Sequence, residues 1–66
     1  MDNWKISLAA ARVNANLTQK QLGDAIGAAE KTINNWESGE SLPNVKWISP
    51  LEEALGLSIN HIRFGR

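Results

Sequence analysis

The sequence predicts a small all-α domain of four to five short helices. Within Gln19–Trp36, apolar residues recur at spacings of four and three on either side of a break, and this is the helical period. Gly27 lies at the break, where a glycine permits a sharp turn without strain. The chain has 66 residues and no cysteine, which suits one domain without disulfides. We therefore expect a single domain over residues 1–66, built around two helices and the turn between them.

The first helix is expected from Asp2 to Ala15. Four residues recur at helical spacing and should face the core, namely Trp4, Leu8, Ala11 and Ala15. Ile6 and Val13 form a second, weaker apolar stripe. This stripe belongs either to a wide buried face or to a surface that contacts a partner.

The second helix is expected from Gln19 to Ala25. Thr18 and Gln21 have the spacing of a capping box, in which each side chain bonds the backbone amide of the other residue. Gly23 allows the next helix to approach closely and costs about 1 kcal/mol of helix stability relative to alanine.

The third helix is expected from Ala29 to Ser38. At 100° per residue, Ile33, Trp36 and Glu37 point inward. The outward side chains are short and polar, and include Lys31, Asn34, Asn35 and Ser38. Ala29 occupies the N-cap position, but its side chain has no oxygen to accept a hydrogen bond from the first-turn amides. The missing cap lowers helix stability by on the order of 1 kcal/mol. The second helix of such a helix-turn-helix fits the DNA major groove, although the outward face could also be merely solvated.

The next helix carries an apolar stripe and a proline. The stripe consists of Val45, Ile48, Leu51 and Leu55. Because Pro50 cannot donate a hydrogen bond, we expect either a kink or a short turn over residues 44–47, capped by Asn44, and then a helix from Pro50 to Leu55. Ser49 and Glu52 have capping-box spacing around Pro50. Trp47 lies off the stripe, as a half-buried lid or an interface residue.

The last helix is expected from Ile59 to about Arg63, with Ser58 as its cap. Ile59 and Ile62 should close the core. His61 lies on the other side, as a surface residue or a dimer contact. Phe64 follows with little chain left to cover it, and an exposed aromatic is plausible interface material.

These motifs together resemble the phage repressor/Cro-type (XRE-like) family of DNA-binding domains. The shared pattern is Gln19, Leu22, Ile26, Gly27, Ile33, Trp36, Glu37 and Gly39. The resemblance spans roughly residues 4–64, with the motif at about 18–38. It implies a lambda-repressor-like fold that binds a double-stranded DNA operator as a homodimer.

The resemblance also assigns roles to individual residues. The implied base-reading residues are Ala29, Glu30, Lys31 and Asn35, because amides and lysine suit base edges. The implied contacts to the DNA backbone are Thr18, Gln19, Lys20, Asn34 and Ser38. Arg12 and Glu37 are expected to form a structural ion pair. Phe64 and His61 are the candidate dimer contacts.

Composition narrows the function classes. The charges of the seven basic and seven acidic residues cancel, so the net charge is zero, whereas DNA binders usually carry a basic excess. The single histidine and the absence of cysteine argue against a metal site. No catalytic motif, cofactor motif or small-molecule site is apparent, and no apolar run is long enough to span a membrane.

We expect a cytoplasmic transcriptional regulator of phage or prophage type, in a bacterial cell or a phage-infected bacterium. The alternative is a protein-interaction module on the same fold, such as an antitoxin-like or anti-repressor partner.

Overall fold

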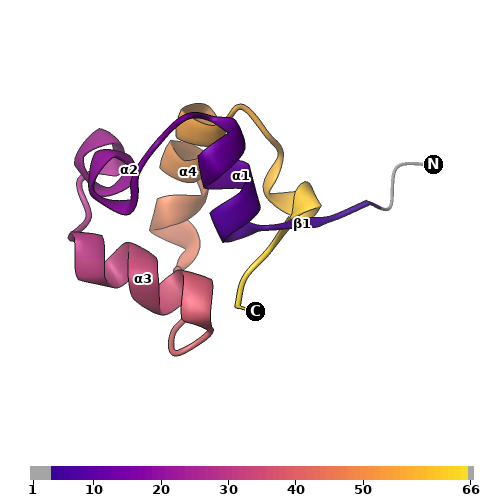
Figure 1. Ribbon diagram of the computed structural model, residues 1–66. Coiled ribbons are helices and arrows are strands. Elements are labelled where there is room, and N and C mark those ends of the chain that lie inside the picture. Colours follow the sequence, from indigo (N-terminus) through magenta and orange to yellow (C-terminus); the bar gives the residue numbers. More distant parts are fainter. Residues whose placement is uncertain (1–3, 66) are drawn as a thin grey trace.

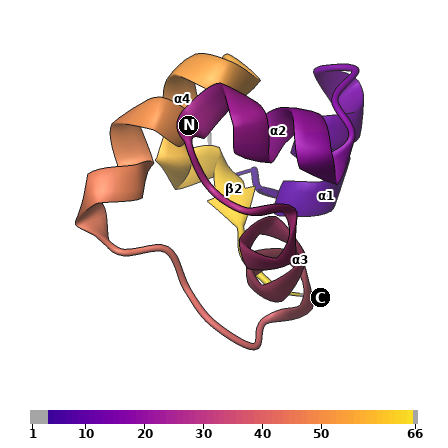
Figure 2. The ribbon, with the colours of Figure 1, turned by 90° about the vertical axis from the view of Figure 1, so that its left-hand side faces the viewer.

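The computed structural model describes residues 4–65 and confirms a helical fold, to which it adds one small strand pair. The elements in chain order are β1 (Ile6–Ser7), α1 (Leu8–Asn14), α2 (Gln19–Ile26), α3 (Glu30–Ser38), the 3-10 turn η1 (Val45–Trp47), α4 (Ile48–Leu55), the 3-10 turn η2 (Ile59–His61) and β2 (Ile62–Arg63). Figure 1 shows α1, α2 and α4 gathered on one side of α3, with the C-terminal end beside α3. In Figure 2, the long loop after α3 leads round to α4.

The core lies where the four helices meet. It consists of Leu8, Ala11, Leu22, Ile33, Trp36, Leu51, Leu55 and Ile62, each less than a tenth exposed. Every α-helix contributes to this cluster, as does β2. Trp47 packs edge-on against Trp36, with ring centroids 5.6 Å apart, and is half-buried, in agreement with the first of its two expected roles. The core thus fixes α3 from its inner side only, and leaves its outer side free.

The N-terminal helix is shorter than the sequence pattern predicted. It begins at Leu8 because the Ser7 hydroxyl accepts a hydrogen bond from the Ala10 amide at 3.0 Å and caps it there. Ile6 instead pairs in parallel register with Ile62. Trp4 is 46% exposed, so its assignment to the core was wrong. Asp2 and Asn3, which the prediction included, lie outside the described residues.

The C-terminal helix predicted from Ile59 to Arg63 is also corrected. Ser58 does act as the cap, and its hydroxyl accepts from the Asn60 amide at 3.2 Å. Only one 3-10 turn follows, because Ile62 and Arg63 extend to pair with β1. The backbone groups of Ile62 and Arg63 therefore bond to a distant segment instead of continuing a helix.

In α4 the helix starts earlier than predicted and lacks the expected capping box. The chain forms the 3-10 turn η1, capped by Asn44, and continues directly into α4 at Ile48. Pro50 is then a first-turn residue, where no N–H is needed. Val45, assigned to the core stripe, is 82% exposed.

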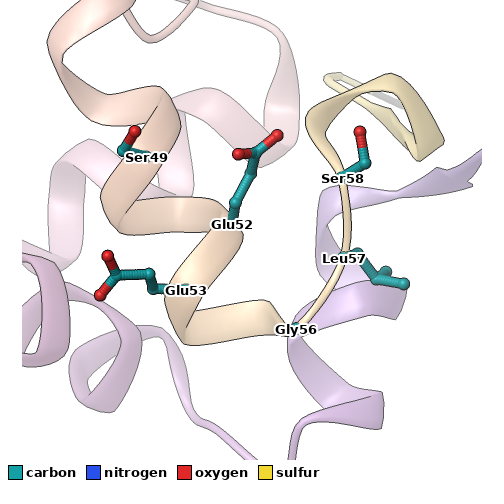
Figure 3. Close-up of a pocket in the computed structure, with 6 residues that line it drawn as sticks. All are labelled: Ser49, Glu52, Glu53, Gly56, Leu57 and Ser58. Carbon is teal, nitrogen blue, oxygen red and sulfur yellow. The ribbon is translucent and has the colours of Figure 1, made fainter.

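Glu52 has a different partner from the one that the capping box implied. Its carboxylate accepts a hydrogen bond from the Ile59 amide at 2.7 Å. Figure 3 shows Glu52 directed toward the segment that carries Ser58, while Glu53 points to the other side of α4. Glu52 therefore ties α4 to η2 and does not cap its own helix.

The turn between α2 and α3 is tight because two glycines allow it. Gly27 has φ +83° and ends α2 in the left-handed conformation. Gly23 is buried, and a Cβ built on it would lie 2.5 Å from the Ala28 carbonyl oxygen. That contact is with backbone, so the turn itself would have to move. Gly23 thus sets how closely the chain can fold back onto α2.

We expect Gly23→Ala to destabilise the domain by about 1 kcal/mol, even though alanine is the better helix former. Moving the turn to make room for the new Cβ lowers the free energy of unfolding by about 1–3 kcal/mol. The higher helix propensity of alanine raises it by at most about 1 kcal/mol. Urea unfolding of the two chains measures the difference. Asp24→Ala, on the exposed side of the same helix, is the control and should stay within about 0.5 kcal/mol. Stabilisation by Gly23→Ala would show that the turn adapts freely.

Candidate nucleic-acid interface

The N-terminus of α2 carries the predicted capping box in full. The Thr18 hydroxyl accepts from the Gln21 amide at 3.0 Å, and the Gln21 side chain accepts from the Thr18 amide at 2.9 Å. The amides of Gln19 and Lys20 belong to the first turn, where a helix offers no backbone acceptor. A helix N-terminus with such amides favours an anion. This end of α2 is therefore suited to a phosphate group.

The outer face of α3 is polar and solvent-accessible. Ala29, Glu30, Lys31 and Asn34 are exposed, and Asn35 and Ser38 are half-buried. Ile33 and Trp36 anchor the opposite side in the core. At the start of the helix, Ala29 makes no side-chain cap bond. At its end, the Ser38 hydroxyl donates to the Asn35 carbonyl at 3.1 Å. The helix thus presents polar side chains outward from a fixed apolar base.

Arg12 and Glu37 join α1 to α3. Arg12 Nε lies 2.7 Å from Glu37 Oε2, and the two side chains are only 15% and 10% exposed. Arg12 Nη1 also donates to the Leu17 carbonyl at 2.7 Å. The guanidinium therefore fixes the end of α1, the segment leading into α2, and α3 at once. Since Arg12 is used internally, it does not add to the positive charge available to DNA.

Gln19 has an internal role that sequence reasoning missed. Its side-chain amide donates to Glu37 Oε1 at 3.0 Å and to Asn34 Oδ1 at 3.3 Å. Helical periodicity places Gln19 at the start of α2 but cannot say which side chain of α3 it faces. The network links α1, α2 and α3 through the single carboxylate of Glu37. The side chain of Gln19 thus joins the two helices of the motif, and its backbone amide stays at the N-terminus of α2.

Charges on this face are few and mixed. Lys20 pairs with Asp24 at 3.4 Å, and both side chains are about 70% exposed, so the pair contributes little. Lys46 lies over the Trp47 ring at 5.1 Å. Lys31 is exposed on α3 beside the acidic Glu30. Lys31 in the motif and Lys46 after it form no ion pair with an acidic side chain of residues 4–65.

The two candidate dimer contacts are less exposed than predicted. Phe64 is half-buried and packs against the core, so the expectation of an exposed aromatic was wrong. His61 is half-buried too and stacks on Trp4, with ring centroids 3.8 Å apart and planes 3° from parallel. His61 Nδ1 also lies 3.0 Å from the Trp4 carbonyl oxygen. His61 therefore links the C-terminal segment to Trp4, whereas Phe64 belongs to the packing around the core.

Two helices joined at a left-handed glycine, the second with a polar outer face, define a helix-turn-helix domain. This class of domain is typical of DNA-binding regulators. The helix-turn-helix family model matches residues 8–62, so the chain belongs to the XRE-like helix-turn-helix family.

Relatives include regulators of several kinds. Multiprotein-bridging factor 1a of Arabidopsis thaliana is 38% identical over 55 residues, which cover 83% of this chain and 39% of that protein. The cryptic phage CTXphi transcriptional repressor RstR of Vibrio cholerae is 36% identical over 58 residues, 88% of this chain and 52% of RstR. The transcriptional activator BcrR of Enterococcus faecalis is 30% identical over 54 residues, 82% of this chain and 26% of BcrR.

The chain thus spans only about a quarter to a half of these relatives' own lengths. No solved structure matches it significantly. Among residues 4–65, no helix is long and apolar enough to cross a membrane.

Proposed function

We propose that the chain is a sequence-specific double-stranded DNA-binding transcriptional regulator that places α3 in the major groove. The observation that carries this proposal is the outer face of α3, whose polar side chains project from a helix fixed by Ile33 and Trp36. Beside it, the N-terminus of α2 offers first-turn amides for a phosphate. One element thus suits base edges and its neighbour suits the backbone. The proposal includes no catalytic step and no cofactor.

The proposed contacts divide by type. Ala29, Glu30, Lys31 and Asn35 read base edges, and the backbone contacts come from Thr18, Gln19, Lys20, Asn34 and Ser38. For Gln19, the backbone amide is the suitable donor because its side-chain amide already bonds Glu37 and Asn34. The exposed carboxylate of Glu30 repels phosphate and accepts from cytosine N4, so it acts mainly by excluding wrong sequences.

Repression by a phage or prophage regulator of Cro type is the finer proposal. It is supported by the match to RstR, which is named a phage transcriptional repressor. The match to BcrR, named an activator, shows that the family alone does not set the direction of regulation. In the proposed mechanism, two copies bind in adjacent major grooves of an operator and sterically block RNA polymerase.

We expect selection from a random duplex library to yield a two-fold symmetric site with half-sites about one helical turn apart. A single copy has zero net charge, so one half-site should bind weakly and two half-sites much more tightly. Mobility-shift titration of duplexes with one and two half-sites measures this, and sedimentation reports the stoichiometry. A monomer that binds one half-site at full affinity would contradict the dimer.

The second candidate is a protein-interaction module, which zero net charge and exposed apolar side chains favour. Val13, Leu42 and Val45 are 60%, 70% and 82% exposed. Trp47 and Phe64, which the sequence also offered to a partner, are half-buried and support this candidate less. If library selection returns no preferred duplex, the interaction module becomes the better proposal.

A further inference from the structure

The C-terminal end of the described chain lies against the end of α3. Figures 1 and 2 both show it beside the last turn of that helix. The Gly65 amide donates to the Trp36 carbonyl at 3.0 Å. Gly65 is buried and has φ +90°, a conformation that L side chains rarely adopt. We call Ile62–Gly65 the C-terminal clasp.

The Trp36 carbonyl needs this donor because local partners are already taken. The last four carbonyls of a helix find no N–H donor within the helix itself. Gly39 and Glu40, which follow α3, both donate to the Asn35 carbonyl at 3.0 Å. Trp36 is 3% exposed, and a buried carbonyl left unpaired costs free energy. The clasp therefore completes the C-terminal cap of α3 from a segment distant in sequence.

Backbone approaches backbone closely at this point. A Cβ built on Gly39 would lie 3.3 Å from the Gly65 Cα, and a Cβ built on Gly65 would lie 3.5 Å from the Gly39 Cα. Two glycines in left-handed conformations thus face each other. At its other end, the clasp pairs Ile62 with Ile6, and Phe64 packs against the core. The clasp is therefore anchored to β1 and to the shared core as well as to α3.

We infer that the C-terminal clasp holds the last turn of α3 in place and that Gly65 is a positioning residue for DNA reading. The turn it completes carries Asn35, whose carbonyl accepts the Gly39 and Glu40 amides. This inference rests on the proposed function for its effect on DNA, but the clasp itself can be tested without DNA. No base contact is assigned to Gly65, which acts through the position of Asn35.

The test compares Gly65→Ala with Gly56→Ala. Gly56 also has positive φ, +69°, and nothing lies within 4 Å of a Cβ built there, so its variant carries left-handed strain at a place that is not part of the clasp. A second variant is a synthetic chain in which an ester oxygen replaces the Gly65 amide nitrogen, which removes the donor without adding an atom. Amide hydrogen exchange is followed by NMR for the Gly39 and Glu40 amides and for α2 as internal reference.

The ester variant should speed exchange of the Gly39 and Glu40 amides about fivefold relative to α2, the equivalent of one lost hydrogen bond. Gly65→Ala keeps its amide, but strain at positive φ should displace that amide from the Trp36 carbonyl and speed the same two sites to a smaller extent. Gly56→Ala should speed all sites alike. On DNA, the Gly65 variants should lose several-fold discrimination at the base pair that Asn35 reads. Exchange that rises equally in α2 and at the end of α3 would show that Gly65 contributes only to global stability and would overturn the inference. Failure of the parent chain to select any duplex would refute the proposed function, whereas the exchange result would still decide the clasp.

Discussion

Glu37→Ala is expected to cost about 3 kcal/mol of folding stability, because it leaves the Arg12 guanidinium buried without its carboxylate partner. The two side chains are 15% and 10% exposed, so water cannot replace the lost contact fully. A domain of 66 residues is expected to have a total stability of roughly 3–10 kcal/mol. This one change should therefore bring the domain near its unfolding threshold. Urea denaturation monitored by tryptophan fluorescence measures it.

The exposed pair Lys20–Asp24 provides the matched control. Its charges are of the same kind but are about 70% exposed, so Lys20→Ala should change stability by less than about 0.5 kcal/mol. Arg12→Ala should resemble Glu37→Ala, and the double variant should cost less than the sum of the two. If both single variants lie within about 0.5 kcal/mol of the parent, the buried pair has no structural role.

Asn35→Ala is expected to cost about 1–3 kcal/mol on the preferred duplex and to relax preference at one base pair. Asn35 lies one turn after Lys31 on the outer face of α3, so both side chains can reach one groove. By contrast, Gln19→Ala keeps the backbone amide proposed to bind phosphate but loses the side-chain bonds that hold α2 to Asn34 and Glu37 of α3. It should therefore weaken all duplexes about equally, because neither α2–α3 packing nor phosphate contact carries sequence information. Fluorescence titration against a panel of single-base operator changes separates the two patterns.

Asn60→Ala serves as the control for Asn35→Ala, because Asn60 is an exposed asparagine in η2, away from the motif. It should change neither affinity nor preference. The stability of Gln19→Ala has to be measured alongside its binding, because the variant also loses the bonds to Glu37 and Asn34. A uniform loss across the panel for Asn35→Ala would remove it from the base-reading residues.

The helix-turn-helix was predictable from the sequence because the interactions that define it are local. The capping box of Thr18 and Gln21 and the uncapped start at Ala29 involve residues at most four apart. The turn at Gly27 needs only positive φ, which glycine supplies. The burial of Leu22, Ile33 and Trp36 follows from helical periodicity. In each case, neighbouring residues decide the conformation, so the sequence by itself determined the motif and the outer face of α3.

Contacts between distant segments were decided only by the tertiary structure. Ile6 extends as a strand because Ile62 offers it backbone partners, and helical periodicity alone does not reveal this pairing. Trp4 fits a helical stripe but stacks on His61 outside the core. Gln19 reaches Glu37 because α2 and α3, which are separate in sequence, pack against each other. These positions depend on which backbone groups and side chains meet across the folded domain, and helical periodicity carries no information about such partners.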